Sequence, residues 1–345
     1  MNNDQLLRRF ARISLVLFFF VILAGSIVRT TGSGMGCPDW PKCFGYYVPP
    51  TTIDPLLFQP AHAYERGQMV VHSDTLWVAN EAFVSAESFD RTNWHKYPKH
   101  DYAIFNPVQT WIEYLNRLAT AVFALPVLLM TFFAFRRWRR QNDLITLLLA
   151  LGSVFMIGFE AWLGKLVVDG NLKTSSVTLH MVGSLAIILC IVALLHRNRI
   201  HRLSDIVSSK AALMLWTGLV FSLVQIMLGT QVREETDVIA QATSDRSQWI
   251  GMMGVLFYIH RSFSILIVAL TGYTWWLLRG STLEGWGKAL LGLIGVEVLA
   301  GIILAYFDMP AWMQPLHLLF AVMWFALSAY LVIRIRTPKS AIAVK

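Results

Sequence analysis

Eight long apolar segments constrain the fold of this chain more than any other feature of its sequence. A helix that crosses a bilayer needs about 20 mostly apolar residues. The chain has 345 residues, 56% of them hydrophobic, which is more than an ordinary soluble domain contains. The sequence therefore predicts an all-α integral membrane protein with eight transmembrane helices. These lie roughly at residues 12–30, 112–134, 144–167, 177–195, 211–231, 255–278, 289–306 and 315–333.

The positions of the positive charges predict how these helices are oriented. A net charge of +8 would suit a nucleic-acid-binding protein, but the charges gather in clusters beside the apolar segments. Lys and Arg accumulate on the cytoplasmic side of membrane proteins, so both termini are expected to be cytoplasmic, and no nucleic acid is expected as a partner. The clusters precede the first segment and follow the second, fourth, sixth and eighth, at Arg8, Arg9, Arg12, Arg136, Arg137, Arg139, Arg140, Arg197, Arg199, Arg202, Lys210, Arg279, Lys288, Arg334, Arg336, Lys339 and Lys345.

The second half of the chain repeats the first. The first and fifth segments both end in Gly-x-x-x-Arg, over residues 25–29 and 229–233, so the first segment is interpreted as a retained helix and not as a cleaved signal peptide. Two four-helix bundles are therefore predicted, residues 1–195 and 196–345, related by a pseudo-twofold axis along the membrane normal. Three further pairs are each separated by 137 residues: Glu160 and Glu297, Gly164 and Gly301, and His180 and His317.

A long extracytoplasmic loop distinguishes the two halves. About 80 residues, 31–110, join the first two apolar segments on the outer side, and they are rich in aromatic and turn-forming residues. A loop of this length is either functional or a small folded cap. Its counterpart in the second half, about residues 233–254, is much shorter and has no cysteine.

The loop carries two of the three cysteines. Cys37 and Cys43 lie in a compartment where disulfides persist. They are either a structural disulfide or a redox-active pair that exchanges electrons with a thiol partner. No Cys-x-x-Cys-His motif is present, so covalent haem attachment is not expected. The third cysteine, Cys190, lies inside the fourth segment and is interpreted as a small apolar filler.

Four polar side chains lie near the beginnings of the even-numbered segments, in the outer third of the membrane. They are Asn116, His180, His260 and His317. One intramembrane histidine is explained equally well by a hydrogen bond in a bundle interior, but three at repeat-related positions indicate ligands. Imidazole suits haem iron, and a haem between facing helices takes one ligand from each side. The second half has two histidines, which predicts a cofactor site, whereas the first has at most one good ligand, which predicts a substrate site.

A carboxylate marks the first half alone. Glu113 lies one turn before Asn116 and four residues before Arg117, with which it forms either a structural ion pair or part of a site as an acid, base or cation stabiliser. At the equivalent position the second half has Phe257.

Other charged residues have two interpretations. Four arginines at the outer ends, namely Arg29, Arg117, Arg233 and Arg261, either neutralise haem propionates or extend to the membrane interface. Glu160 and Glu297 are expected to have a structural role, by hydrogen bonding within the bundle or by pairing with Lys165.

These motifs together resemble the haem A synthases, which are cytochrome oxidase assembly enzymes of bacteria and mitochondria. The resemblance covers nearly the whole chain and is most specific in three places: Thr31-Gly32-Ser33-Gly34 followed by the segment from Cys37 to Cys43, Glu113-Tyr114 with Arg117, and the outer-end histidines. It implies an enzyme of the cell inner (cytoplasmic) membrane that oxidises the C8 methyl group of haem O to a formyl group, giving haem A for cytochrome c oxidase.

The resemblance also implies roles for individual residues. A haem b cofactor would be held by His260 and His317, and the substrate haem O would lie in the first half with His180, Asn116 and Arg117. Glu113 matches the family's functionally important glutamate, and Cys37 and Cys43 match its loop cysteine pair. Haem O synthase, cytochrome oxidase assembly proteins and an electron acceptor are the implied partners.

The chain departs from the family in two places and leaves two other functions open. Many members have histidine where this chain has Asn116, and the second cysteine pair of some members is missing. One alternative is a dihaem b-type electron-transfer protein, which would need two bis-histidine sites at different depths. The other is a haem-handling assembly factor, which would bind haem O without converting it and would leave Glu113 unexplained.

Overall fold

The prediction of an all-α, multi-pass membrane protein is confirmed. A computed structural model describes residues 2–98, 105–169, 175–198 and 205–336, and Arg199, Arg202, Lys339 and Lys345 lie outside them. Eight helices in the described part are long and apolar enough to cross a membrane. They are α1 (Asn3–Thr30), α2 (Pro107–Gln141), α3 (Leu144–Asp169), α4 (Ser175–Arg197), α5 (Ser209–Ala242), α7 (Val255–Leu278), α8 (Glu284–Tyr306) and α9 (Met313–Arg334).

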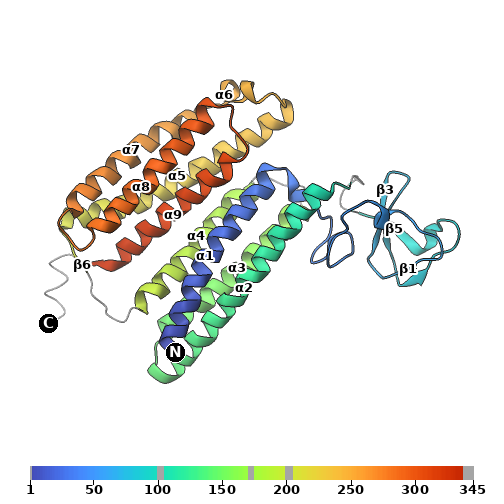
Figure 1. Ribbon diagram of the computed structural model, residues 1–345, viewed down its shortest axis with the longest axis horizontal. Helices are drawn as coiled ribbons and strands as arrows, with labels where there is room; N and C mark the ends of the chain where they lie inside the picture. The colour runs from blue at the N-terminus through green and yellow to red at the C-terminus, as the bar shows by residue number, and fades with distance from the viewer. Residues whose placement is uncertain (1, 99–104, 170–174, 199–204, 337–345) are drawn as a thin grey trace.

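The helices lie in two groups that meet along α9 (Figure 1). Helices α1 to α4 lie together, and α5, α7, α8 and α9 form the other group. Helix α9 packs against both α1 and α4 of the first group. One apolar core therefore runs through the junction, and it includes the fully buried Leu7, Met130, Ile188 and Val322.

Side-chain caps define the start of several helices. Asn2 and Gln5 form a capping box at α1, and Asn106 accepts hydrogen bonds from two backbone N–H groups at the start of α2, where Pro107 is the first residue. These contacts satisfy N–H groups that the helix itself leaves without partners. Ser208 caps α5 in the same way.

Helix α5 is longer than its apolar segment. The expected segment ended near residue 231, but the helix continues to Ala242. The prediction was too short because it followed hydropathy alone, and polar residues continue the helix beyond the apolar zone. Part of the expected short outer loop, 233–254, is therefore helical, and the four-residue helix α6 (Trp249–Met252) occupies another part.

The long loop between α1 and α2 contains a small folded unit, here called the cap (residues 31–98). The end of the helices beside the cap is called the outer end below, and the opposite end the inner end. It lies beyond the outer ends of α1 and α2 (Figure 1). A hairpin at Ser73 and Asp74 has both residues at positive φ, as a two-residue turn of this kind requires. Two antiparallel sheets form, β1–β4 and β2–β3–β5, from β1 (Ala63–Tyr64), β2 (Met69–His72), β3 (Thr75–Ala79), β4 (Phe83–Val84) and β5 (Trp94–Lys96).

An aspartate ties the helices together at the opposite end of the first group. Asp143 accepts hydrogen bonds from Arg137 Nε (2.9 Å), Arg197 Nη2 (2.8 Å) and Thr146 Oγ1 (2.8 Å). Burial alone would raise the pKa of Asp143, but hydrogen bonds from Arg197, Thr146 and Arg137 outweigh it and hold the pKa well below its ordinary value. The basic clusters after α2 and α4 therefore lie at the same end of the bundle.

The second group has a comparable contact at its own inner end. Asp205 accepts hydrogen bonds from Arg334, at the end of α9, and from Thr282, between α7 and α8. Asp205 belongs to the short strand β6 (Asp205–Ile206), which pairs in parallel with β7 (Ile335–Arg336). Both halves thus join the last helix of the half to an aspartate in a connecting segment.

Candidate functional site

Each of the four special polar side chains faces a glycine of the preceding transmembrane helix. A methyl group built on each glycine would lie 3.1 to 3.9 Å from the facing side chain. The four contacts join Gly25 to Asn116, Gly164 to His180, Gly229 to His260 and Gly301 to His317. Small residues let helices approach closely. Asn116 therefore occupies the structural position that histidine occupies at the other three sites.

His260 and His317 lie close together in the second half. Their ring centroids are 6.4 Å apart and the rings are nearly perpendicular, at 83°. A metal–imidazole nitrogen bond is about 2 Å long, so two rings on opposite sides of one metal ion have centroids about 6 Å apart. His260 Nδ1 is buried without a hydrogen-bond partner among the described residues. The spacing of the two rings fits a bis-histidine haem site.

Two glutamates lie against the histidines at repeat-related positions. Glu160 Oε2 is 2.5 Å from His180 Nδ1, and Glu297 Oε1 is 3.1 Å from His317 Nδ1. Of the two expectations for Glu160, hydrogen bonding within the bundle is observed, and Lys165 is exposed. The identity of the partner was missed, although Glu160 lies one turn before Gly164, the residue that faces His180.

Glu113 is buried near the start of α2, and each of its two carboxylate oxygens has a hydrogen-bond partner. Its side chain is 6% exposed, and it forms the ion pair with Arg117 that was one of its two interpretations. Its other oxygen, Oε2, accepts a hydrogen bond from the backbone N–H of Cys37 at 2.8 Å. A charge-assisted bond of this type is what allows a carboxylate to be buried.

Arg117 fastens the cysteine loop to the same helix. Its Nη1 donates to the carbonyl oxygens of Asp39 (2.6 Å) and Lys42 (3.0 Å), and its Nη2 donates to that of Cys37 (3.3 Å). The interpretation of Arg117 as an interfacial residue is incomplete, because four of its contacts are with the protein, Glu113 included.

Cys37 and Cys43 form a disulfide, and both are buried. Thr110 Oγ1 donates to the carbonyl of Gly36 at 2.8 Å, and a methyl group at Gly36 would lie 2.5 Å from the backbone of Gln109. Glycine is therefore required for the loop to approach α2 this closely. Burial raises the pKa of Asp39, whose Oδ2 accepts from Gly45 N–H.

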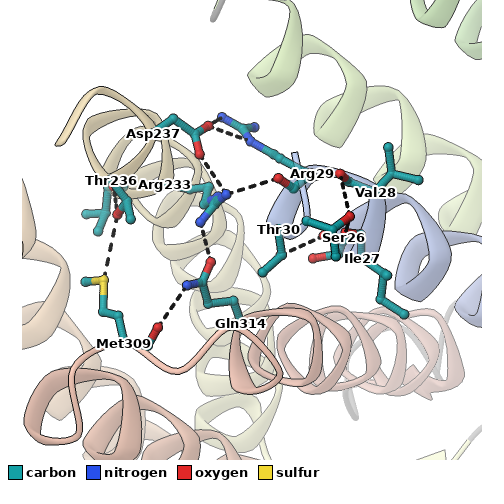
Figure 2. A network of polar contacts seen from close by, with 12 residues as sticks. Ser26, Ile27, Val28, Arg29, Thr30, Arg233, Thr236, Asp237, Met309 and Gln314 are labelled. Carbon is teal, nitrogen blue, oxygen red and sulfur yellow. Dashed lines mark hydrogen bonds and ion pairs between the residues drawn. The ribbon is translucent and has the colours of Figure 1, made fainter. Parts of the chain in front are cut away.

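Two of the outer arginines share one carboxylate where the halves meet (Figure 2). Arg29, at the end of α1, lies 2.6 Å from Asp237, and Arg233 of α5 lies 2.7 Å from the same side chain. Arg233 also donates to Gln314 of α9. The fourth arginine, Arg261, is exposed and lies over the ring of Tyr258 at 5.2 Å. The contact at Asp237 was not foreseen, because it lies beyond the expected end of the fifth segment.

The structure thus defines a multi-pass membrane protein with repeat-related imidazole sites at the outer ends of its helices. Within the described residues, no group of three or more His, Cys, Asp or Glu side chains could enclose a metal ion. The chain matches the family described as Cytochrome oxidase assembly protein (COX15-CtaA) over residues 8–69 and 67–329. It belongs to this family.

Several relatives of this chain, three of which are described here, carry the name Heme A synthase. The protein of Shewanella oneidensis is 27% identical over 220 residues, which are 63% of this chain and 54% of the relative. That of Shouchella clausii is 26% identical over 159 residues, or 46% of this chain and 34% of the relative. That of Geobacillus kaustophilus is 37% identical over 62 residues, or 18% of this chain and 20% of the relative. The matches therefore span about half or less of the length of these relatives.

Proposed function

We propose that this protein is a haem A synthase that oxidises the C8 methyl group of haem O to a formyl group. The observation that carries the proposal is the difference between the two outer sites. In the second half His260 lies beside His317, whereas the first half has one histidine, His180, has Asn116 at the position equivalent to His260, and adds the buried Glu113. Two strong iron ligands suit a cofactor that is held permanently, whereas one strong ligand suits a substrate that must leave. Family membership and the names of the relatives support the same activity.

The second half would hold haem b through His260 and His317. The 6.4 Å separation of the two rings supports this assignment, as does the glycine facing each of them. When bound, this haem supplies one-electron transfer. The protein's own contribution would be to present both imidazoles and to hold together the helices that carry them. Gln225 Nε2 of α5 donates to the carbonyl oxygen of His260 in α7 at 3.0 Å, which joins these two helices beside the site.

The first half would bind haem O beside Glu113. Conversion of the methyl group to a hydroxymethyl group removes two electrons and two protons and takes its oxygen from water. A second two-electron oxidation gives the formyl group. Glu113 would stabilise positive charge that develops at the oxidised carbon, or accept the protons that are released. Arg117 and the N–H of Cys37 hold its carboxylate in one position for that role.

The protein would act in the cell inner membrane with both termini in the cytoplasm. The inner-end clusters of Arg137 and Arg197 support this orientation, because basic residues accumulate on the cytoplasmic side. The cap and the outer sites would then face the opposite side. Its substrate would come from a haem O synthase, its product would pass to cytochrome oxidase assembly proteins, and an electron acceptor would take the electrons.

Haem extraction and chromatography test the proposal directly. The full chain is expressed with a haem O synthase in a host whose electron-transfer partners support a known haem A synthase. Haem A is expected, with hydroxymethyl haem as a minor species. Unchanged haem O beside bound haem b would contradict the activity. Quinol-dependent haem reduction in that protein would then favour electron transfer, and binding of haem O alone would favour a haem-handling factor.

A further inference from the structure

The two carboxylate–histidine contacts are not explained by the roles given so far. Glu160 and Glu297 are 137 residues apart, as are His180 and His317, so the same contact occurs at equivalent places in both halves. Each glutamate lies on the helix before its histidine. A carboxylate within a bundle is costly, and neither glutamate has a Lys or Arg ion-pair partner among the described residues. Packing alone gives no reason for the repetition.

The chemistry of the contact determines which imidazole nitrogen is left free. An ionised carboxylate only accepts hydrogen bonds, so the proton of a neutral imidazole that bonds to it lies on Nδ1. The lone pair then lies on Nε2, on the far side of the ring. Metal-bound histidines commonly donate their other N–H to a carboxylate in this way, which fixes the ring and strengthens it as a ligand.

The first-half contact is the tighter one, and a glycine makes room for it. A methyl group at Gly183 would lie 1.9 Å from Glu160 Oε1, so only glycine leaves space for this carboxylate. The position 137 residues further on is Phe320. In the second half the separation is longer, 3.1 Å, and His317 Nδ1 has no well-aligned hydrogen bond. The half with a single histidine thus has the more closely held imidazole.

We propose that Glu160 and Glu297 are positioning residues for the haem ligands His180 and His317. Each lies within 3.1 Å of Nδ1 of its histidine, where it favours the tautomer whose Nε2 faces the iron. Glu160, the closer of the two, makes His180 a stronger ligand and so compensates for the weak partner Asn116. This inference rests on the proposed haem sites. It goes beyond them by assigning a role to side chains that touch neither haem nor the reacting methyl group.

Leucine and glutamine variants separate the hydrogen bond from the charge. Glutamine can still accept the Nδ1 proton through its amide oxygen, whereas leucine cannot. Full-length protein in nanodiscs is loaded with ferric protohaem or with haem O, and the dissociation constant, electron paramagnetic resonance spectrum and midpoint potential are measured. E160L and E297L are expected to weaken haem binding about 10 to 100-fold in their own half. E160Q and E297Q retain binding but shift the potential upward, by about 59 mV for each tenfold loss of preference for ferric iron.

Gly183→Ala provides a variant that leaves both partners chemically intact. Its methyl group displaces Glu160, so first-half binding should fall as in E160L while the second half is unchanged. Alanine favours the helix more than glycine does, so general unfolding is not the expected cause. Glu235→Gln is the matched control, because Glu235 accepts a hydrogen bond from Gly254 N–H and no histidine.

Two results would overturn the proposal, and they differ in what else they remove. If His180→Ala and His317→Ala lose haem but the leucine and G183A variants bind it as tightly as the wild type, with the same spectra and potentials, the glutamates position nothing and the proposed function stands. If the histidine variants also retain their haem, the histidines are not ligands, and the positioning role falls together with the assignment of the haem sites.

Discussion

The two halves of this protein share a framework but differ at their outer ends. In both, glycines of one helix face a polar side chain of the next, and an inner-end aspartate binds an arginine. At the outer end the first half has Glu113, Asn116 and the cap, where the second has Phe257, His260 and a helical extension. Duplication therefore provides two similar sites, and in the function proposed above a few substitutions near the helix starts give each a different task.

The comparison also shows why the carboxylate and the cap occur in the same half. Glu113 is buried because Arg117 and the N–H of Cys37 both bind it, and the second of these partners belongs to the cap. At the equivalent position Phe257 needs no polar partner and is buried by packing. A buried carboxylate without its partners would cost several kcal/mol. The cap thus stabilises the carboxylate that only the first site carries at this position.

The largest expected effect comes from Glu113→Gln, which removes the negative charge that only the first half carries at this position. Loss of a positioned acid or base should lower the rate of haem A formation about 10² to 10⁴-fold. Glutamine can still accept from Cys37 N–H, so the cap should remain in place. Chromatography of extracted haems over time measures the rate, with Glu235→Gln as the control. Haem A formation at the wild-type rate would remove Glu113 from the mechanism.

Much of this framework could be predicted from the sequence because it depends on local patterns. Apolar length alone identified all eight helices, and the 137-residue repeat related His180 to His317 and Gly164 to Gly301. What hydropathy could not give was the polar end of α5 and the strands of the cap, since neither depends on contact with lipid. The hairpin turn at Ser73 and Asp74 needs both residues at positive φ, and this residue pair alone does not predict that conformation because other pairs adopt it as well.

The partners of charged groups were the least predictable part of the site. Glu113 and Arg117 could be paired from their helical spacing alone. Glu160 and His180 are on different helices, and their contact depends on how α3 and α4 pack. The same holds for Asp237, which binds arginines of α1 and α5. Long-range ion pairs of this kind follow from packing geometry, which a single sequence does not provide.

A reciprocal exchange tests whether Asn116 and His260 account for the difference in haem binding. Loss of a residue that only hydrogen-bonds to a metal ligand weakens metal binding roughly 10 to 100-fold. His260→Asn removes a proposed ligand itself, so it should weaken haem binding in the second half by at least this factor. Asn116→His should tighten first-half binding about tenfold and give a low-spin spectrum, because an imidazole fits beside Gly25 as it does beside Gly229. Optical and electron paramagnetic resonance spectra of both variants measure this. Unchanged spectra in both would mean that these residues do not reach the iron.

Asp143→Asn should destabilise the inner end of the first half alone. The variant loses charged hydrogen bonds to Arg137 and Arg197, which should lower the free energy of unfolding by about 2 kcal/mol at pH 7. Because the folded-state pKa of Asp143 lies below its ordinary value of 3.8, its stabilisation is complete above that pH and is lost as the pH falls toward the lower, folded-state pKa.

Thermal unfolding between pH 2 and pH 7 measures both parts of that expectation. The wild type should lose stability more steeply below about pH 4 than the variant does. Asp205→Asn serves as the comparison, since it breaks the corresponding contact with Arg334 in the second half. Equal acid sensitivity of the wild type and Asp143→Asn would show that Asp143 does not carry this dependence.

Replacing Cys37 and Cys43 together by serine should loosen the cap and leave the second half intact. A disulfide with a sequence separation of 6 encloses a short loop, and in the chain-entropy account its loss costs about 2 kcal/mol. Protease cleavage within residues 31–98 should become faster, and haem A formation should fall because Glu113 loses a fixed partner. Cys190→Ala, which removes a free thiol inside α4, is the control. Wild-type cleavage with normal haem A formation would contradict a structural role.

The smallest effect is expected where the halves meet. Asp237→Asn removes the carboxylate shared by Arg29 and Arg233, whose side chains are 22% and 23% exposed. Ion pairs this accessible contribute about 0 to 1 kcal/mol each, so a total loss of about 1 kcal/mol is expected. Arg233→Met should cost more than Arg29→Met, because Arg233 also binds Gln314. Thermal unfolding at low and high salt measures the loss, which should shrink as salt screens the charges. A salt-independent loss, or a larger one for Arg29→Met, would mean that packing and not charge joins the outer ends of the halves.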